Sequence, residues 1–218
     1  MPAIFAFALI IIESLFLYRY LPETLKKTTD KKKQKEQKKD VRVWYLVLFS
    51  FLFMFSGTEF TLTFLTFQLY GYTNRQQGYL LAYMGVLSAL FQTMYVRRFV
   101  HTKVSERTII LQGLVATTLA LGIMASSSTL ITYPNAILAA VTFLAFSTAT
   151  VVNCINGLVS LHDPSGAAIG KLRSVGQLAR AFGPIVLSCV YWLKGSDVAY
   201  SVACVGMAGI SSVVYLFT

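Results

Sequence analysis

The stretch from Gly170 to Trp192 reads GKLRSVGQLARAFGPIVLSCVYW and has the length and apolar character of a membrane-spanning helix. One charged residue, Arg180, lies well inside this apolar run. At a rise of about 1.5 Å per residue, Arg180 is about 15 Å from the start of the helix, close to the midplane of a hydrocarbon layer of about 30 Å. An arginine at this depth costs at least ~2.5 kcal/mol, so we expect it to have a partner and to face protein or a water-filled cavity.

The helical period gives this segment a polar face and, about a quarter turn away, a face of small residues. The polar face contains Arg173, Gln177, Arg180 and Pro184, and the small face contains Gly176, Ala179 and Gly183. Small residues allow a neighbouring helix to approach closely. We therefore expect one face to pack against another helix and the other face to contact something polar.

The composition identifies the class of protein. Of the 218 residues, 56% are hydrophobic and 13% are charged, and the mean hydropathy is +0.62. Soluble domains carry about 25% charged residues, so this is a membrane protein. The formal charge of +10 comes from basic residues clustered between the apolar runs, which indicates a role in membrane topology and argues against nucleic-acid binding. The three cysteines lie in apolar stretches and have neither disulfide nor metal-site spacing.

The chain contains several apolar runs that are long enough to span a membrane. They lie at about 3–20, 43–67, 77–96, 108–131, 136–161, 167–193 and 197–218. The fold class predicted from them is an all-α membrane protein with seven transmembrane helices. The first run contains Glu13 and has no basic start or cleavage site, so it is a true span and not a signal peptide. It begins abruptly at Met1, which suggests that an N-terminal portion is missing.

Residues 22–42 read PETLKKTTDKKKQKEQKKDVR and are predicted to form a basic cytoplasmic linker. The segment has no apolar periodicity, and we interpret it as a solvated tether between a helix at 1–21 and a six-helix bundle at 43–218. A nuclear-localisation signal or a patch for anionic lipids are the alternatives. The basic loop with Arg97 and Arg98 is separated from this linker by two predicted spans, so both lie on the same side of the membrane. Their positive charge identifies that side as the cytoplasm, and the C-terminus, four spans further on, lies there as well.

The second predicted span carries one polar stripe on a cylinder of Phe and Leu, with members three or four residues apart. The stripe consists of Ser56, Glu59, Thr63 and Thr66. Such a stripe lines either a cavity or a helix contact. Glu59 could couple a proton or cation or contact a solute, or it could form a structural hydrogen bond or ion pair. Its depth differs from that of Arg180 by about 9 Å, so the sequence leaves open whether the two residues pair.

The fifth predicted span places Asn153 and Asn156 on nearly the same face. Each is either a solute contact or a structural residue, since interhelical hydrogen bonds of this type contribute only ~0.6 kcal/mol on average. The chain shows no spacing typical of a metal site, a catalytic nucleophile, a phosphate loop or a pair of catalytic carboxylates. We therefore expect no enzyme activity and no cofactor.

Specific motifs resemble those of the major facilitator superfamily. Leu21-Pro22-Glu23-Thr24 resembles the PET sequence that often closes the sixth helix of that family. The stretch SGTEFTLTFLT at 56–66, followed by QQG at 76–78, is similar to the tetracycline-transporter-like subgroup, which is described as carrying organic anions and drugs. GKLRS at 170–174 and LARAFGP at 178–184 look like the eleventh-helix signature of that subgroup.

The resemblance implies that the seven spans correspond to helices six to twelve of a major facilitator fold. The second and fifth spans would then line the central cavity, the third and sixth would flank it, and the fourth and seventh would lie outside. Two features depart from the family: Gly183-Pro184 is not followed by the Gly-Gly of the antiporter motif, and Arg97-Arg98 lacks the Asp and Gly of the signature loop. Antiport is therefore not implied. The residues expected in gating or packing are Gly176, Gly183, Pro184, Arg97 and Arg98.

The hypothesis from the sequence is an integral multi-pass membrane protein that acts as a secondary transporter, or as part of one, by alternating access. Arg180 would attract a small organic anion and Glu59 would couple or orient it. The residues predicted to bind solute or to couple are Glu59, Arg180, Gln177, Thr63, Asn153 and Asn156. The expected partners are the solute, the lipid bilayer and a missing N-terminal six-helix half. The alternative is a truncated protein that does not transport and serves as an interaction module.

Overall fold

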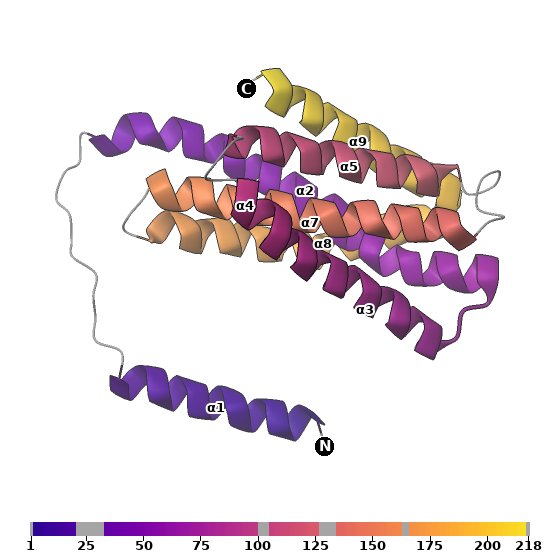
Figure 1. The fold of residues 1–218 in the computed structure, drawn as a ribbon, viewed down its shortest axis with the longest axis horizontal. Helices are drawn as coiled ribbons and strands as arrows, with labels where there is room; N and C mark the ends of the chain where they lie inside the picture. Colours follow the sequence, from indigo (N-terminus) through magenta and orange to yellow (C-terminus); the bar gives the residue numbers. More distant parts are fainter. Residues whose placement is uncertain (1, 21–32, 100–104, 127–133, 163–165, 217–218) are drawn as a thin grey trace. The chain divides into compact units, whose positions relative to one another are not determined.

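The computed structural model describes residues 2–20, 33–99, 105–126, 134–162 and 166–216, and these residues are almost entirely helical, with no strand among them (Figure 1). The elements are α1 (Pro2–Tyr20), α2 (Lys33–Tyr70), α3 (Asn74–Leu90), the π-helix η1 (Phe91–Val96), α4 (Arg97–Phe99), α5 (Glu106–Ala125), α7 (Pro134–His162), α8 (Ala167–Lys194) and α9 (Ser196–Leu216). The chain divides into two compact units, residues 1–30 with α1 and residues 31–218 with the remaining helices.

The helices coincide with the apolar runs of the sequence, which confirms the predicted all-α membrane fold. In the described part of the chain, five helices are both long and apolar enough to cross a membrane: Arg42–Tyr70, Asn74–Val96, Glu106–Ala125, Asn135–Leu161 and Ser196–Leu216. The helix α8 has 28 residues and is also long enough, but Arg173, Gln177 and Arg180 lower its hydropathy. The polar face of α8 therefore distinguishes it from the other long helices of the second unit.

The first helix of the second unit, α2, begins at Lys33 and not at Val43, where the apolar run starts. The basic segment is therefore helical from Lys33 onward, whereas its composition suggested a solvated tether. Lys, Gln and Glu are good helix formers, and extending an existing helix avoids the cost of nucleating a new one. Residues 22–32 of the predicted linker, and the PET motif with them, lie outside the described residues.

Local sequence signals set the turns that connect the helices. Gly71 has φ of +63° after the end of α2, a conformation that favours glycine. The next helix, α3, starts with a capping box, in which the Thr73 side chain accepts a hydrogen bond from the Gln76 backbone and the Gln76 side chain accepts one from Thr73 N–H. Gly195, with φ of +94°, separates α8 from α9. Each of these turns reverses the chain so that consecutive helices run antiparallel.

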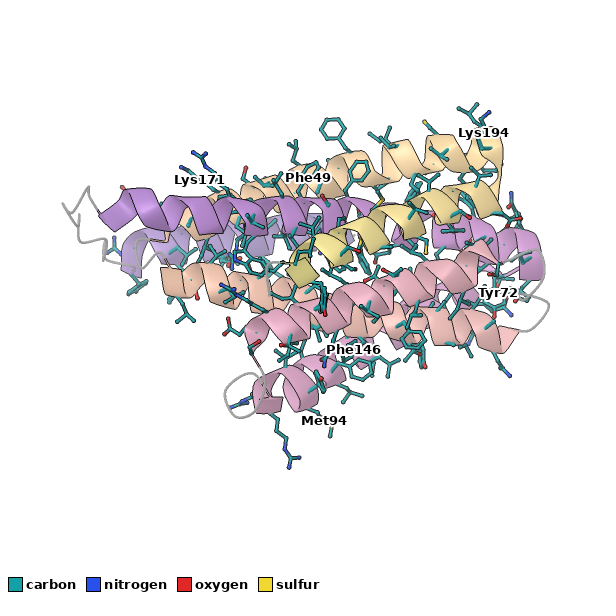
Figure 2. All side chains as sticks on the ribbon, turned by 90° about the horizontal axis from the view of Figure 1, so that it is seen from above. Phe49, Tyr72, Met94, Phe146, Lys171 and Lys194 are labelled. Atoms are coloured by element: carbon teal, nitrogen blue, oxygen red, sulfur yellow. The ribbon has the colours of Figure 1, made fainter. Side chains whose placement is uncertain are left out.

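The helices of the second unit form a bundle in which α2 packs along α8, and α5 packs along both α7 and α9 (Figures 1 and 2). The helix α5 contributes fully buried side chains to the core of the bundle, among them Ile109, Leu114 and Leu121. Of the five candidate spans, the one that contains α3 is the least covered by protein: only 11% of the most apolar part of Asn74–Val96 is buried within the chain. A membrane helix with so little protein cover has its remaining surface available to lipid or to another protein.

Glycines bring α2 and α8 into close contact. A Cβ atom on Gly183 would lie 2.3 Å from the Phe53 carbonyl oxygen and 2.5 Å from Ser56 Oγ. A Cβ atom on Gly57, on the opposite helix, would lie 2.8 Å from the Gly183 carbonyl oxygen. Gly176 extends this contact, since its Cβ would lie 2.9 Å from Leu52 Cδ1. The structure thus packs the small face of α8 against α2, the arrangement that the spacing of its small residues indicates.

We expect Gly183→Ala to destabilise the protein by about 1–3 kcal/mol, because the added methyl group would overlap backbone that cannot move aside. The measurement is the thermal unfolding midpoint in detergent. Gly170→Ala on the same helix is the matched control, since a Cβ there meets no atom within 4 Å. Its midpoint should stay unchanged or rise slightly, given the higher helix propensity of alanine. Equal effects of the two substitutions would contradict the close contact.

Candidate functional site

The helix α8 presents three different faces. Its buried face contains Gly176, Ala179 and Gly183 and packs against α2. Its second face is polar and exposed, with Arg173, Gln177 and Arg180. Its third face is apolar and exposed; Leu178, Phe182 and Ile185 on it are 53%, 51% and 60% exposed. The polar face lies between the packed and the apolar faces, so it borders both a helix contact and a surface that suits lipid.

Arg180 is exposed in the described structure, and its guanidinium has no hydrogen bond or direct ion pair among the described residues. It interacts electrostatically with Glu59 of α2, through space and not through a direct ion pair. The two residues that the sequence left as a candidate pair are thus near one another on adjacent helices. An arginine in this position retains its donors for a further acceptor.

Glu59 is half-buried, and Thr63, one helical turn further along α2, is half-buried as well. The Thr63 hydroxyl donates to the Phe60 carbonyl at 2.8 Å. The Thr63 carbonyl also accepts a hydrogen bond of 3.0 Å from Gln77 Nε2, which links α2 to α3. The Glu59 side chain, by contrast, has no hydrogen-bond partner in the described part of the chain.

The polar stripe of α2 divides between two environments. Glu59 and Thr63 remain partly exposed, whereas Ser56 and Thr66 are buried. Ser56 lies beside Gly183 in the contact with α8, and the Thr66 hydroxyl donates to the Leu62 carbonyl at 2.9 Å. The stripe thus serves partly as a helix contact and partly as an open polar surface, because the tight packing with α8 covers one end of it.

Asn153 and Asn156 lie on α7. Asn153 is exposed, and its Nδ2 donates to the Ala149 carbonyl at 2.7 Å. This bond stays within one helix, so Asn153 forms no bond between helices here; an exposed amide can satisfy itself on the carbonyl of the preceding turn. Asn156 is half-buried and has no side-chain hydrogen bond among the described residues. Both amides keep donors or acceptors for a further partner.

The residues predicted for gating or packing occupy two places. Gly176, Gly183 and the half-buried Pro184 belong to α8, and the two glycines contact α2. Arg97 and Arg98 form the start of α4, at the end of the continuous segment α3–η1–α4, and both are exposed. The arginines therefore belong to a different helix from Glu59 and Arg180.

Two tyrosines that the sequence did not single out connect α8 and α9 to α2. The Tyr191 hydroxyl donates to Gln68 Oε1, and the Tyr200 hydroxyl donates to Thr61 Oγ1 at 3.1 Å. Both tyrosines are buried, at 3% and 0% exposure. The sequence signal was a phenol inside an apolar span, because a buried tyrosine hydroxyl usually finds a partner. The partner itself could not be identified without the packing.

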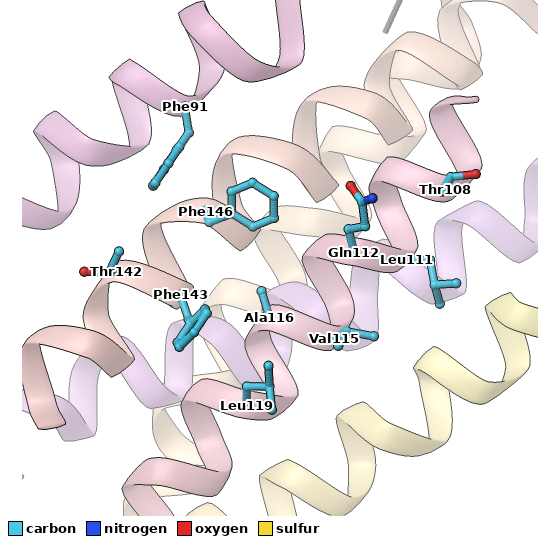
Figure 3. A pocket seen from close by; sticks show the side chains of 10 residues that line it. All are labelled: Phe91, Thr108, Leu111, Gln112, Val115, Ala116, Leu119, Thr142, Phe143 and Phe146. Carbon is cyan, nitrogen blue, oxygen red and sulfur yellow. The ribbon is translucent and has the colours of Figure 1, made fainter. Parts of the chain in front are cut away.

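An apolar groove of about 510 Å³ lies between η1, α5 and α7 (Figure 3). None of the residues predicted to bind solute lines it. The groove is therefore separate from the polar face that carries Arg180 and Glu59. In the described part of the chain, no cluster of three or more His, Cys, Asp or Glu residues could hold a metal ion.

Comparison with known proteins gives a consistent result. The family model described as Major Facilitator Superfamily matches residues 1–184. Major facilitator superfamily domain-containing protein 10 of Mus musculus is 33% identical over 160 residues, which cover 72% of this chain and 34% of that protein. The Homo sapiens protein of the same name is 34% identical over 159 residues, with the same shares covered. This chain thus spans about a third of the length of these relatives.

A solved structure shares the fold as well. It is described as the crystal structure of the human organic anion transporter MFSD10 (TETRAN), and it matches with a TM-score of 0.73 at 30% sequence identity. The match covers 81% of this chain and 41% of the other. The helices of this chain are therefore arranged as in a solved membrane protein.

If the polar face of α8 borders water, Arg180→Cys should react with a charged, membrane-impermeant thiol reagent in vesicles, because such reagents attack the thiolate that forms in water. The background would have its three native cysteines replaced by alanine. Phe182→Cys on the apolar face is the matched control and should stay unmodified in lipid. The measurement is the modified fraction by mass spectrometry. Modification of Phe182→Cys alone would show that the polar face does not border water.

Proposed function

Since this chain belongs to the major facilitator superfamily and is an integral multi-pass membrane protein, we propose that it forms the C-terminal half of a secondary transporter for small organic anions. Members of this family are transporters, so the chain is not an enzyme. The single observation that carries the anion preference is the exposed Arg180, a guanidinium within a spanning helix with no hydrogen-bond acceptor in the described chain. An organic carboxylate or sulfate would supply that acceptor.

The proposed solute site centres on the polar face shared by α8 and α2. Arg180 binds the anionic group, and Gln177, one turn away on the same exposed face, offers amide donors. Thr63 on α2 and the two asparagines of α7 supply further polar contacts. Large apolar side chains such as Phe60, 48% exposed, lie next to this face and suit the organic part of the solute.

Glu59 has a proposed role in coupling. Its carboxylate interacts electrostatically with Arg180 without bonding to it. A bound anion would therefore compete with Glu59 for the positive charge, and protonation of Glu59 would strengthen the attraction of Arg180 for the anion. Such a carboxyl links solute binding to a proton or cation, and this is the coupling expected of a secondary transporter.

Alternating access is proposed to use the α2–α8 pair as a rigid unit. The two helices are in close contact at Gly57, Gly176 and Gly183, so we expect a rearrangement to move both together. A second six-helix half would complete the cavity, with the basic linker and the C-terminus on the cytoplasmic side. The related structure is described as an organic anion transporter, and this supports the chemical class of solute proposed here.

In a chain carrying both six-helix halves, Arg180→Ala should lower the uptake of organic anions about ten- to a hundredfold, since a hydrogen bond to a charged group contributes ~1.5–3 kcal/mol. Arg180→Lys should keep part of the activity because it keeps the charge. The measurement is uptake of labelled carboxylates and sulfates into proteoliposomes. Arg75→Ala is the control, because Arg75 bonds the exposed Tyr79 at 3.0 Å outside this face.

Two outcomes would count against the solute contact. Unchanged uptake by the Arg180→Ala protein would exclude it. Loss of folded protein on the same substitution would instead assign Arg180 a structural role, in which its charge is needed beside Glu59. Size-exclusion profiles of the purified variants separate the two outcomes.

Glu59→Gln tests the coupling role separately. The substitution keeps the shape of the side chain and removes its charge, so exchange of solute across the membrane should persist while accumulation driven by an ion gradient is lost. Glu59→Asp, which keeps the carboxyl group, should retain part of the gradient response. Exchange and gradient-driven uptake are measured in the same proteoliposomes. Full accumulation by the Glu59→Gln protein would exclude a coupling role for this residue.

A further inference from the structure

The groove between η1, α5 and α7 suits an apolar occupant. Its walls include Phe91, Val115, Leu119, Phe143 and Phe146, and polar atoms contribute almost nothing to its surface (Figure 3). A charged or strongly polar solute would lose its hydration there without gaining hydrogen bonds, at a cost of several kcal/mol. The groove is therefore unsuited to the anion proposed for the polar face of α8.

The groove lies in the membrane-spanning part of the chain and is open at the surface of the bundle. All three elements that form it belong to candidate membrane spans, Asn74–Val96, Glu106–Ala125 and Asn135–Leu161. Three of its wall residues remain well exposed, with 45% for Val115, 52% for Leu119 and 37% for Phe143. Apolar side chains exposed at this depth of a spanning helix meet lipid chains directly.

The length of the groove matches one leaflet of the bilayer. Along α5 its lining runs from Thr108, close to the helix start at Glu106, to Leu119. By helical rise this distance is roughly 16 Å, about half of a hydrocarbon layer of about 30 Å. This length corresponds to that of a single acyl chain, which extends across about half of the hydrocarbon layer.

Aromatic contacts hold one wall of the groove in place. The Phe146 ring lies edge-on to Phe91 and to Tyr95, with centroids 5.3 and 5.2 Å apart. The Tyr95 hydroxyl donates to Gln112 Oε1 at 2.7 Å, which ties η1 to α5. This wall is fixed by contacts between three elements and does not depend on an occupant to form it. A preformed groove lowers the ordering cost of binding.

Basic residues lie next to two of the elements that form the groove. Arg97 and Arg98 follow η1 directly, Arg107 lies in the first turn of α5, and all three side chains are exposed. The topology predicted from the sequence places these residues at the cytoplasmic face, whose leaflet is rich in anionic lipids. Their charge therefore complements a lipid headgroup that carries a phosphate.

We propose that this groove binds one acyl chain of an anionic phospholipid, with Arg97 contacting its phosphate. A sterol has a similar length, but its neutral hydroxyl would make no use of this arginine. The site involves none of the residues assigned to solute binding, so the inference stands independently of the proposed transport function.

The test is the thermal unfolding of the full chain in detergent with added lipid, because a ligand that binds only the folded state raises the midpoint. Dioleoyl phosphatidylglycerol should raise the midpoint more than dioleoyl phosphatidylcholine, which shares the chains but not the net charge. Dihexanoyl phosphatidylglycerol, which shares the headgroup but has short chains, should have little effect. Val115→Trp should abolish the shift by filling the groove, and Arg97→Gln should reduce the preference for phosphatidylglycerol.

Val205→Trp is the matched control, since Val205 lies on the exposed surface of α9 and is 73% exposed. This variant should keep the full response. Leu119→Trp replaces Val115→Trp if the latter does not yield folded protein. The proposal is overturned if the groove-filling variant responds as Val205→Trp does, or if the two dioleoyl lipids act equally. It is also overturned if cholesterol, and not phosphatidylglycerol, gives a shift that Val115→Trp abolishes.

Discussion

The close contact between α2 and α8 is the constraint on which the candidate site depends. In a bilayer the hydrophobic effect does not favour one helix contact over another, so association depends on close packing. Gly57 and Gly183 allow this packing because no side chain separates the two backbones. The contact fixes Glu59 on α2 and Arg180 on α8 near one another, close enough for their charges to interact without a direct ion pair.

The same contact explains why one polar side chain is buried without a hydrogen bond. Ser56 Oγ is buried, and it has no hydrogen-bond partner in the described part of the chain. Ser56 lies where α2 approaches Gly183, so its small volume fits a position that a larger side chain could not occupy. Serine is common at such membrane-helix contacts for this reason. Tyr191 and Tyr200, by contrast, are large and each gains a partner on α2.

The bundle therefore offers two surfaces with opposite chemistry. The polar face of α8 carries an arginine whose donors have no acceptor in the described chain, and it suits an anion. The groove beside Phe146 has almost no polar surface and suits a lipid chain. Different helices form the two surfaces, so polar solute and bilayer lipid need not compete for one site. This separation follows from the three-faced pattern of α8 and from the π-helical end of α3, which brings Phe91 and Tyr95 onto Phe146.

The sequence by itself determined the class of protein, the approximate bounds of its helices and the two faces of α8, because hydropathy and the helical period are properties of consecutive residues. It also singled out Gly176 and Gly183 as contact residues by their spacing. It could not show that α2 begins at Lys33, that Ser56 and Thr66 of the polar stripe are buried, or that Asn153 forms its hydrogen bond within its own helix. Only the tertiary structure decided these features, together with the tyrosine partners and the groove, because each depends on which residues from distant parts of the chain lie side by side.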